Sequence, residues 1–137
     1  MIFPELQTTA SAAAKPLPLA KEVLFDFTRG VPVFRGGVPV YVTGREAVRV
    51  WAWKALNTWR CRYPIYSRSY GCDVYDLIGR AYSEDLKHSE AVRYVRDCLS
   101  INPYVKEVRD VAVDFNGDLL TISCCVSSIY GEVTLNV

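Results

Sequence analysis

The fold is decided by residues 110–137, which read DVAVDFNGDLLTISCCVSSIYGEVTLNV. Within this stretch, Asn116-Gly117 is the dipeptide most typical of a two-residue hairpin turn. A hairpin closed there pairs Val113 with Leu120 and Val111 with Ile122 on one apolar face. The other, mostly polar face pairs Asp114 with Leu119, Ala112 with Thr121 and Asp110 with Ser123. This contrast between faces predicts a half-buried antiparallel pair of strands.

A third strand is predicted from Ile129 to Val137. Its apolar residues Ile129, Val133, Leu135 and Val137 alternate with Tyr130, Glu132, Thr134 and Asn136. Only Glu132 carries a charge that discourages pairing with another chain. We therefore expect a terminal edge strand to which a neighbouring chain adds a strand, with Val133 and Leu135 buried in that contact. A strand that merely completes the chain's own sheet is the alternative.

Two helices are predicted before this sheet, at Arg45–Trp59 and Ser83–Ser100, because apolar residues recur there at three- and four-residue spacing. The stripes are Val48, Trp51, Ala52, Ala55, Leu56 and Trp59, and then Ala91, Val92, Val95, Cys98 and Leu99. Ser83 is a typical N-cap, and Asn102-Pro103 ends the second helix. Between the helices, residues 60–66 are expected to be extended, and Asp73 to cap a short helix.

The amino-terminal part divides into an arm and a first set of strands. Residues 1–21 are rich in Ala, Pro, Thr and Ser and are expected to be an extended or disordered arm. Residues 22–137 are expected to form a single domain. A strand is predicted from Val23, followed by a hairpin about Gly36-Gly37 that pairs Val33 with Val40 and Val31 with Val42. The order of strands, helices and strands predicts an α+β domain, with helices packed on a small antiparallel sheet.

Composition and motifs argue against several kinds of site. The 137 residues carry a formal net charge of +1, so no global field favours a nucleic acid or a membrane. Five cysteines without a CxxC pair and a single histidine do not fit a zinc site, and we interpret the cysteines as reduced thiols. Neither a phosphate loop nor a nucleophilic triad can be assembled. We expect no catalytic, cofactor-binding or metal-binding residues.

Two other functions stay open. Asp73, Asp76, Glu84 and Asp85 are carboxylates close in sequence, as a glycosidase requires, although helix starts explain them equally well. Arg60, Arg62 and Arg68 interleave with Tyr63, Tyr66 and Tyr70. Such a segment is typical of single-stranded nucleic-acid binding and of protein–protein hot spots, and the net charge favours the protein interface.

A set of short motifs resembles the XkdS-like proteins of phage-like elements, which are similar to the wedge family of contractile tails. The motifs are Val42-Thr43-Gly44-Arg45-Glu46-Ala47, Trp51, Lys54-Ala55-Leu56, Arg62-Tyr63-Pro64-Ile65-Tyr66, Tyr70-Gly71 and Asp76-Leu77-Ile78-Gly79. The resemblance covers about residues 22–137. The wider family closes its long helix with a Glu-Pro-Arg element that contacts neighbouring subunits. This chain has Asn102-Pro103-Tyr104 there, so a polar and aromatic contact is expected instead of a salt bridge.

The resemblance implies a structural baseplate wedge protein that starts the sheath of a contractile phage tail or tail-like bacteriocin. It implies six copies, contacts with sheath subunits, other wedge proteins and the tail tube, and assembly in the bacterial cytoplasm into a virion tail. Some members carry a lysozyme-like label, which keeps a cell-wall hydrolase as an alternative. The expected protein-interface residues are Arg60, Arg62, Tyr63, Tyr66, Asn102, Pro103, Tyr104, Ile129, Tyr130, Val133, Leu135 and Val137.

Overall fold

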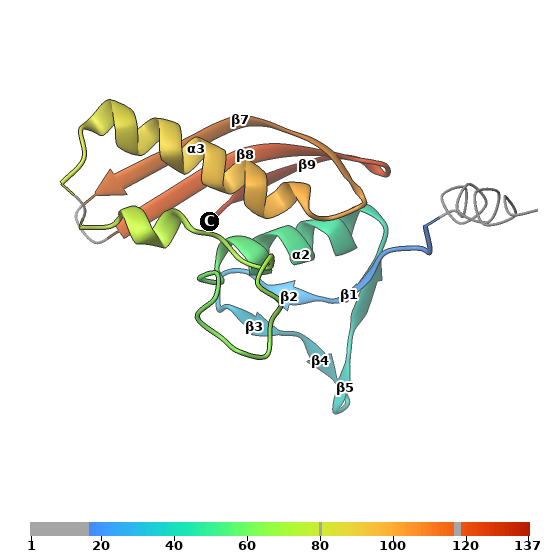
Figure 1. The fold of residues 1–137 in the computed structure, drawn as a ribbon. Coiled ribbons are helices and arrows are strands. Elements are labelled where there is room, and N and C mark those ends of the chain that lie inside the picture. The colour runs from blue at the N-terminus through green and yellow to red at the C-terminus, as the bar shows by residue number, and fades with distance from the viewer. Residues whose placement is uncertain (1–16, 80, 117–118) are drawn as a thin grey trace, which may run out of the picture.

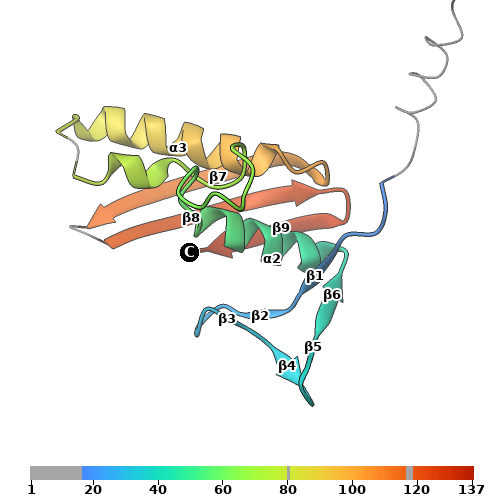
Figure 2. The ribbon, with the colours of Figure 1, turned by 60° about the horizontal axis from the view of Figure 1, so that its bottom comes forward.

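The computed structural model describes residues 17–79, 81–116 and 119–137 (Figure 1). Its main body is a three-stranded antiparallel sheet in the order β7-β8-β9, with two helices, α2 and α3, on one face (Figures 1 and 2). The bounds are β7 Val105–Asn116, β8 Leu119–Ser128, β9 Gly131–Asn136, α2 Arg45–Leu56 and α3 Glu84–Ser100, with a short 3-10 helix, η1, at Val74–Leu77. The predicted α+β class is confirmed.

The register of the β7-β8 hairpin differs from the prediction by two residues. The structure pairs Val113 with Ile122 and Asn116 with Leu119, whereas the sequence suggested Val113 opposite Leu120. Because side chains alternate with a period of two, this shift keeps the same residues on each face. The turn expected at Asn116-Gly117 reaches residues outside those described. The expected pairing of Asp110 with Ser123 is wrong for the same reason, since Ser123 pairs with Ala112, and Asp110 lies in a bulge between Arg109 and Ala112.

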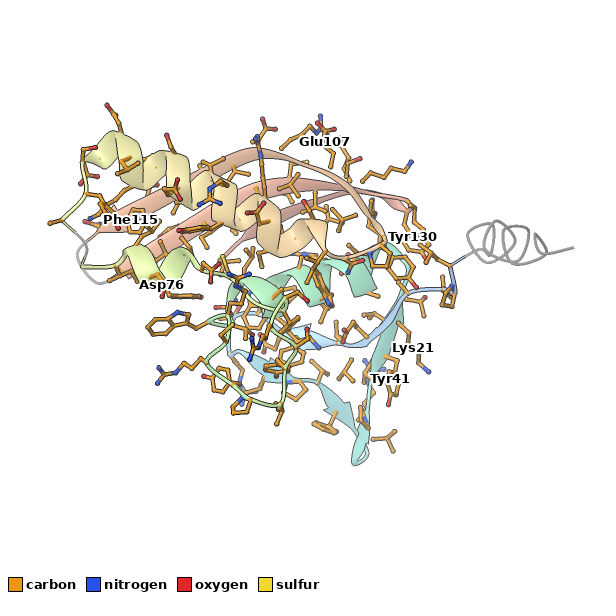
Figure 3. All side chains as sticks on the ribbon, viewed as in Figure 1. Lys21, Tyr41, Asp76, Glu107, Phe115 and Tyr130 are labelled. Carbon is orange, nitrogen blue, oxygen red and sulfur yellow. The ribbon has the colours of Figure 1, made fainter. Side chains whose placement is uncertain are left out.

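The inward face of the sheet and the two helices share one core. Val108, Val126 and Val133 form one cross-strand row on this face, and Cys124 and Leu135 form the next. The helical residues of the same cluster include Ala52, Ala55, Leu56, Ala91, Val95, Cys98 and Leu99. Each buried valine or leucine contributes about 1.5–3 kcal/mol to the stability of the fold. The outward face carries polar residues such as Glu107 (Figure 3).

Helix α2 ends three residues earlier than predicted. The Asn57 Nδ2 donates to the Trp53 carbonyl at 2.8 Å, and the Thr58 hydroxyl donates to the Lys54 carbonyl at 2.8 Å. These side chains satisfy carbonyls of the last turn and so favour its termination at Leu56. Trp59 therefore lies beyond the helix and is 37% exposed, and its predicted place in the apolar stripe is wrong.

Helix α3 begins and ends close to the predicted residues. The Ser83 hydroxyl accepts a hydrogen bond from the Leu86 backbone N–H at 3.3 Å, as expected of an N-cap. Val92 is half-buried rather than part of the buried stripe. Asp73 precedes η1 but makes no capping hydrogen bond, because its carboxylate accepts hydrogen bonds from Arg60 instead.

The amino-terminal strands form three small ladders below α2 (Figure 2). The bounds are β1 Lys21–Val23, β2 Phe25–Asp26, β3 Val31–Pro32, β4 Phe34–Arg35, β5 Val38–Pro39 and β6 Tyr41–Thr43. The predicted Val33–Val40 pair is confirmed by a 3.0 Å hydrogen bond from the Val40 N–H to the Val33 carbonyl. The Val31–Val42 pair is wrong, because the segment around Leu24 inserts between these strands. Leu24 donates its N–H to the Val40 carbonyl and accepts from the Val33 N–H.

Candidate protein-assembly interface

The outer edge of β9 presents main-chain groups that no other strand uses in the described part of the chain. Ile122 and Val137 exchange two backbone hydrogen bonds, at 3.0 and 2.8 Å. Because hydrogen-bonded pairs alternate in an antiparallel ladder, Leu135, two residues away, also turns its main chain toward β8. The intervening Thr134 therefore turns its N–H and C=O away from the sheet, as do Glu132 and Asn136. This edge can accept a further strand.

The side chains of β9 that were predicted to contact a partner are buried within the chain instead. Val133 is 6% exposed and Leu135 is 2% exposed, and both pack in the core formed with α2 and α3. The expectation that these two side chains become buried against a neighbouring chain is therefore wrong. Their place in the core follows from the alternation of the strand over the helices. What β9 offers a partner is its main chain, together with the exposed side chains of Thr134 and Asn136, since the Glu132 carboxylate is paired with Arg109.

The opposite edge of the sheet, along β7, is less suited to pairing. Its ladder with β8 changes register twice, and Asp110 has a φ of 53° at the second shift. The charged residues Lys106 and Glu107 lie at the first shift. Bulges and charges are features by which edge strands avoid adding another chain. Of the two edges, β9 is the more regular one.

Residues 60–71 form a compact loop rather than the extended segment predicted. A parallel bridge between Trp59 and Cys72 closes its neck, with the Cys72 N–H donating to the Thr58 carbonyl at 2.8 Å. The Arg60 guanidinium reinforces the closure through a hydrogen bond from its Nε to the Asp73 carboxylate at 2.9 Å and an ion pair with the same carboxylate at 2.7 Å. Successive turns fold the chain between these points, because Pro64 and the tight neck do not allow an extended path.

This loop carries four of the predicted interface residues and their neighbours. Tyr63 is 49% exposed, Tyr66 is 46% exposed, and Ile65 between them is 87% exposed. The Tyr66 ring lies 4.8 Å from that of Tyr70, which contacts Trp51 of α2. The Arg62 guanidinium lies over the Trp59 ring at 5.2 Å. The structure thus brings together Arg60, Arg62, Tyr63 and Tyr66 in one loop. Contacts within the chain hold the loop in place.

Most of the remaining predicted interface residues lie at the corner after α3 and at the β8-β9 connection, whereas Val137 packs against the core and pairs with Ile122. Asn102 is 8% exposed, and its side-chain oxygen accepts from the Tyr104 N–H at 2.8 Å, so its polar group serves the helix stop. The Tyr104 hydroxyl donates a hydrogen bond to the Pro18 carbonyl, and the Tyr130 hydroxyl accepts one from the Ala20 N–H. Pro103 and Ile129 remain exposed beside them. The aromatic contact expected at this position is made within the chain.

No residues of the described segments form a group of three or more side chains that could hold a metal ion. The five cysteines are free thiols. A hydrogen bond with Cys72, together with burial, raises the pKa of the Cys98 thiol, and burial raises the pKa of Cys124 to about 11. The carboxylates of Asp73 and Asp76 accept hydrogen bonds from Arg60 and from the Trp59 indole. These carboxylates stabilise local structure and line two different hollows rather than a common one.

Residues 21–131 match the family described as the contractile injection system sheath initiator. The chain belongs to the sheath initiator family. The curated relatives of this chain include the phage-like element PBSX protein XkdS of Bacillus subtilis (strain 168), which is 28% identical over 95 residues. That alignment covers 69% of this chain and 67% of the relative. The resemblance drawn from the motifs between Val42 and Gly79 is therefore confirmed.

Membership of the sheath initiator family assigns a structural role in starting the sheath at the baseplate of a contractile tail. It also implies contacts with sheath and baseplate components, as part of the tail of a virion or a related particle. The family match begins at β1 and ends at the first residue of β9, so most of the terminal strand lies beyond it. No helix of the described residues is long and apolar enough to span a membrane.

Proposed function

We propose that this sheath initiator starts the sheath by strand addition at the outer edge of β9. The observation that carries the proposal is that the main chain of Glu132, Thr134 and Asn136 faces outward, while the inward side chains of β9 already hold this strand in the core. A segment of a sheath subunit laid along this edge would gain backbone hydrogen bonds without requiring the initiator to unfold. Affinity would come from the main chain, with Thr134 and Asn136 adding polar contacts.

The surrounding assembly follows from the same proposal. Six copies around the lower end of the tail tube would present six such edges to the first sheath ring, and other wedge proteins would hold them in place. The resemblance to wedge proteins and the family's place at the baseplate support this arrangement. Assembly would take place in the bacterial cytoplasm, where the reducing conditions would keep the five free thiols reduced.

The proposed role needs neither catalysis nor nucleic acid. A glycosidase needs two carboxylates of unlike environment flanking a substrate site, whereas Asp73 is paired with Arg60 at a loop neck. The loop of residues 60–71 could stack single-stranded bases on its tyrosines. Its rings, however, pack on one another and on α2, which suits contact with another protein better.

The experiment is to replace Thr134 by proline in particles assembled without the native initiator. Proline removes the outward N–H and is tolerated at such a position of an edge strand, so the domain should stay folded. Thr134→Val keeps the N–H and the β-branched shape, and it is the matched control. Electron microscopy should show tubes on baseplates without a sheath for Thr134→Pro and sheathed tails for Thr134→Val. Normal sheaths on Thr134→Pro baseplates would contradict strand addition at this edge.

A further inference from the structure

Two of the buried thiols, those of Cys72 and Cys98, meet in the core. Cys72 lies at the neck of the loop of residues 60–71, where it forms the bridge to Trp59, and Cys98 lies near the end of α3. Their residues are 0% and 3% exposed and belong to the same core cluster. The proposed part in starting the sheath uses neither thiol.

The position of the Cys72 sulfur brings it to Cys98. The Cys72 Sγ lies 3.9 Å from the carbonyl oxygen of Tyr94, which is one helical turn before Cys98 on α3. A side chain on a helix lies over the turn that precedes it, so the Cys98 thiol is directed to the same place. The two thiols are hydrogen-bonded to each other, which lowers the pKa of Cys72 and raises the pKa of Cys98. Cys72 is therefore the more readily ionised of the two.

A hollow gives small molecules a route to this pair. It measures about 390 Å³, and its lining includes Cys98, Tyr94 and the two neighbours of Cys72 in sequence, Gly71 and Asp73. Hydrogen peroxide is little larger than water and fits such a hollow. A thiolate beside a second thiol is the arrangement in which peroxide oxidation ends in a disulfide.

We propose that Cys72 and Cys98 form a redox site that hydrogen peroxide converts into an intramolecular disulfide. The Cys72 thiolate attacks one peroxide oxygen, the O–O bond breaks, and a sulfenic acid and hydroxide result. The Cys98 sulfur then attacks the Cys72 sulfur, the S–S bond forms, and the hydroxyl group leaves as water with the thiol proton. In total, two thiols and one peroxide give one disulfide and two water molecules.

The disulfide would fasten the loop neck to α3. Such a link restricts the unfolded chain between residues 72 and 98 and so stabilises the folded protein. Reducing conditions inside a cell keep the pair as thiols, whereas a particle that has left the cell meets oxidising conditions in which the link persists. The inference does not depend on strand addition, because neither cysteine lies in β9.

Peptide mapping of the full chain tests the proposal. Cys61→Ser serves as the parent protein, since it removes the exposed thiol that could join two chains. After treatment with hydrogen peroxide, the remaining thiols are blocked with iodoacetamide in denaturant and the chain is cut with trypsin. The tryptic peptides 69–80 and 97–106, which carry the two cysteines, should appear joined and two hydrogen atoms lighter than their sum.

Two further variants of this parent separate the steps. Cys125→Ser removes a half-buried thiol elsewhere and should keep the link. Cys98→Ser should abolish the link and leave Cys72 as a sulfenic acid that dimedone labels. Circular dichroism verifies that each variant is folded, and mapping of the parent does not depend on them.

Stability provides the second measurement. The urea midpoint of the linked parent should rise by about 1 M or more and return to its starting value on reduction with dithiothreitol. Absence of the joined peptides after peroxide treatment would overturn the proposal. A link from either cysteine to Cys124 instead, or a linked protein whose urea midpoint does not rise, would overturn it as well.

Discussion

Tyr104 stacks on Tyr130, with ring centroids 6.0 Å apart and ring planes inclined by 21°. The Tyr104 hydroxyl donates to the Pro18 carbonyl at 2.7 Å, and the Tyr130 hydroxyl accepts from the Ala20 N–H at 3.0 Å. The pair therefore fastens the start of the described chain to the corner after α3 and to the β8-β9 connection. Segments more than eighty residues apart in sequence are held by two rings.

Removing these hydroxyl groups should loosen the amino-terminal segment without disturbing the sheet. Tyr104→Phe and Tyr130→Phe keep the stacked rings, and each should lower the free energy of unfolding by about 0.5–1.5 kcal/mol, the net contribution of a typical hydrogen bond. Urea denaturation measures this loss. Hydrogen exchange of the Ala20 amide should accelerate in Tyr130→Phe more than in Tyr104→Phe. Equal exchange in both variants would show that the Tyr130 hydroxyl does not hold this segment.

Gly71 at the loop neck should not tolerate a side chain. A Cβ at this position would lie 2.9 Å from both the Arg60 Cα and the Thr58 carbonyl oxygen, and the φ is +108°. Gly71→Ala should therefore cost about 1–3 kcal/mol of stability and distort the loop. Gly79→Ala is the matched control, because Gly79 also has a positive φ, +79°, but meets nothing within 4 Å. If the two variants lost equal stability in thermal unfolding, the close packing of the neck would be wrong.

Tyr75 should make the stability depend on pH in the alkaline range. Its hydroxyl donates to the Leu56 carbonyl at 2.7 Å, and burial raises its pKa from 10.0 to about 12. Between these values the unfolded chain loses the proton while the folded chain keeps it, so stability falls as pH rises. Tyr75→Phe should make that fall shallower, measured by urea denaturation at stepped pH. An unchanged slope would contradict the burial of the hydroxyl.

Purified protein should release no muropeptides from peptidoglycan, because the carboxylates of Asp73 and Asp76 are engaged in local hydrogen bonds away from a common cavity. Incubation with labelled cell walls, beside an active lysozyme as the positive control, measures this directly. Release that disappears in Asp73→Asn would establish the hydrolase alternative.

The sequence predicted the elements whose apolar spacing is regular. Helix α3 and the alternation of β9 could be derived because periodicity and a serine cap suffice. The hairpin register could not, because Asn116-Gly117 suggested a turn without revealing how far the ladder extends or that a bulge occurs at Asp110. The pairing of Val31 also failed, since only the tertiary structure shows that Leu24 inserts between the strands.

The candidate interface was predicted only in part, because local sequence signals do not reveal contacts between residues that are distant in sequence. Composition identified the exposed Arg/Tyr segment, but its loop shape depends on contacts between Gly71, Arg60 and Asp73 that are distant in sequence. Alternation correctly identified the inward residues of β9, but it could not tell whether a neighbour or α2 covers them.

The central claim is that the outer edge of β9 becomes paired when the sheath starts, and amide hydrogen exchange at Thr134 tests it most directly. In the isolated chain, the Leu135 amide should be protected by its pairing with β8, while the Thr134 amide should exchange rapidly. In baseplates carrying the first sheath ring, Thr134 should become protected as well. Rapid exchange of the Thr134 amide in sheathed particles would contradict the account.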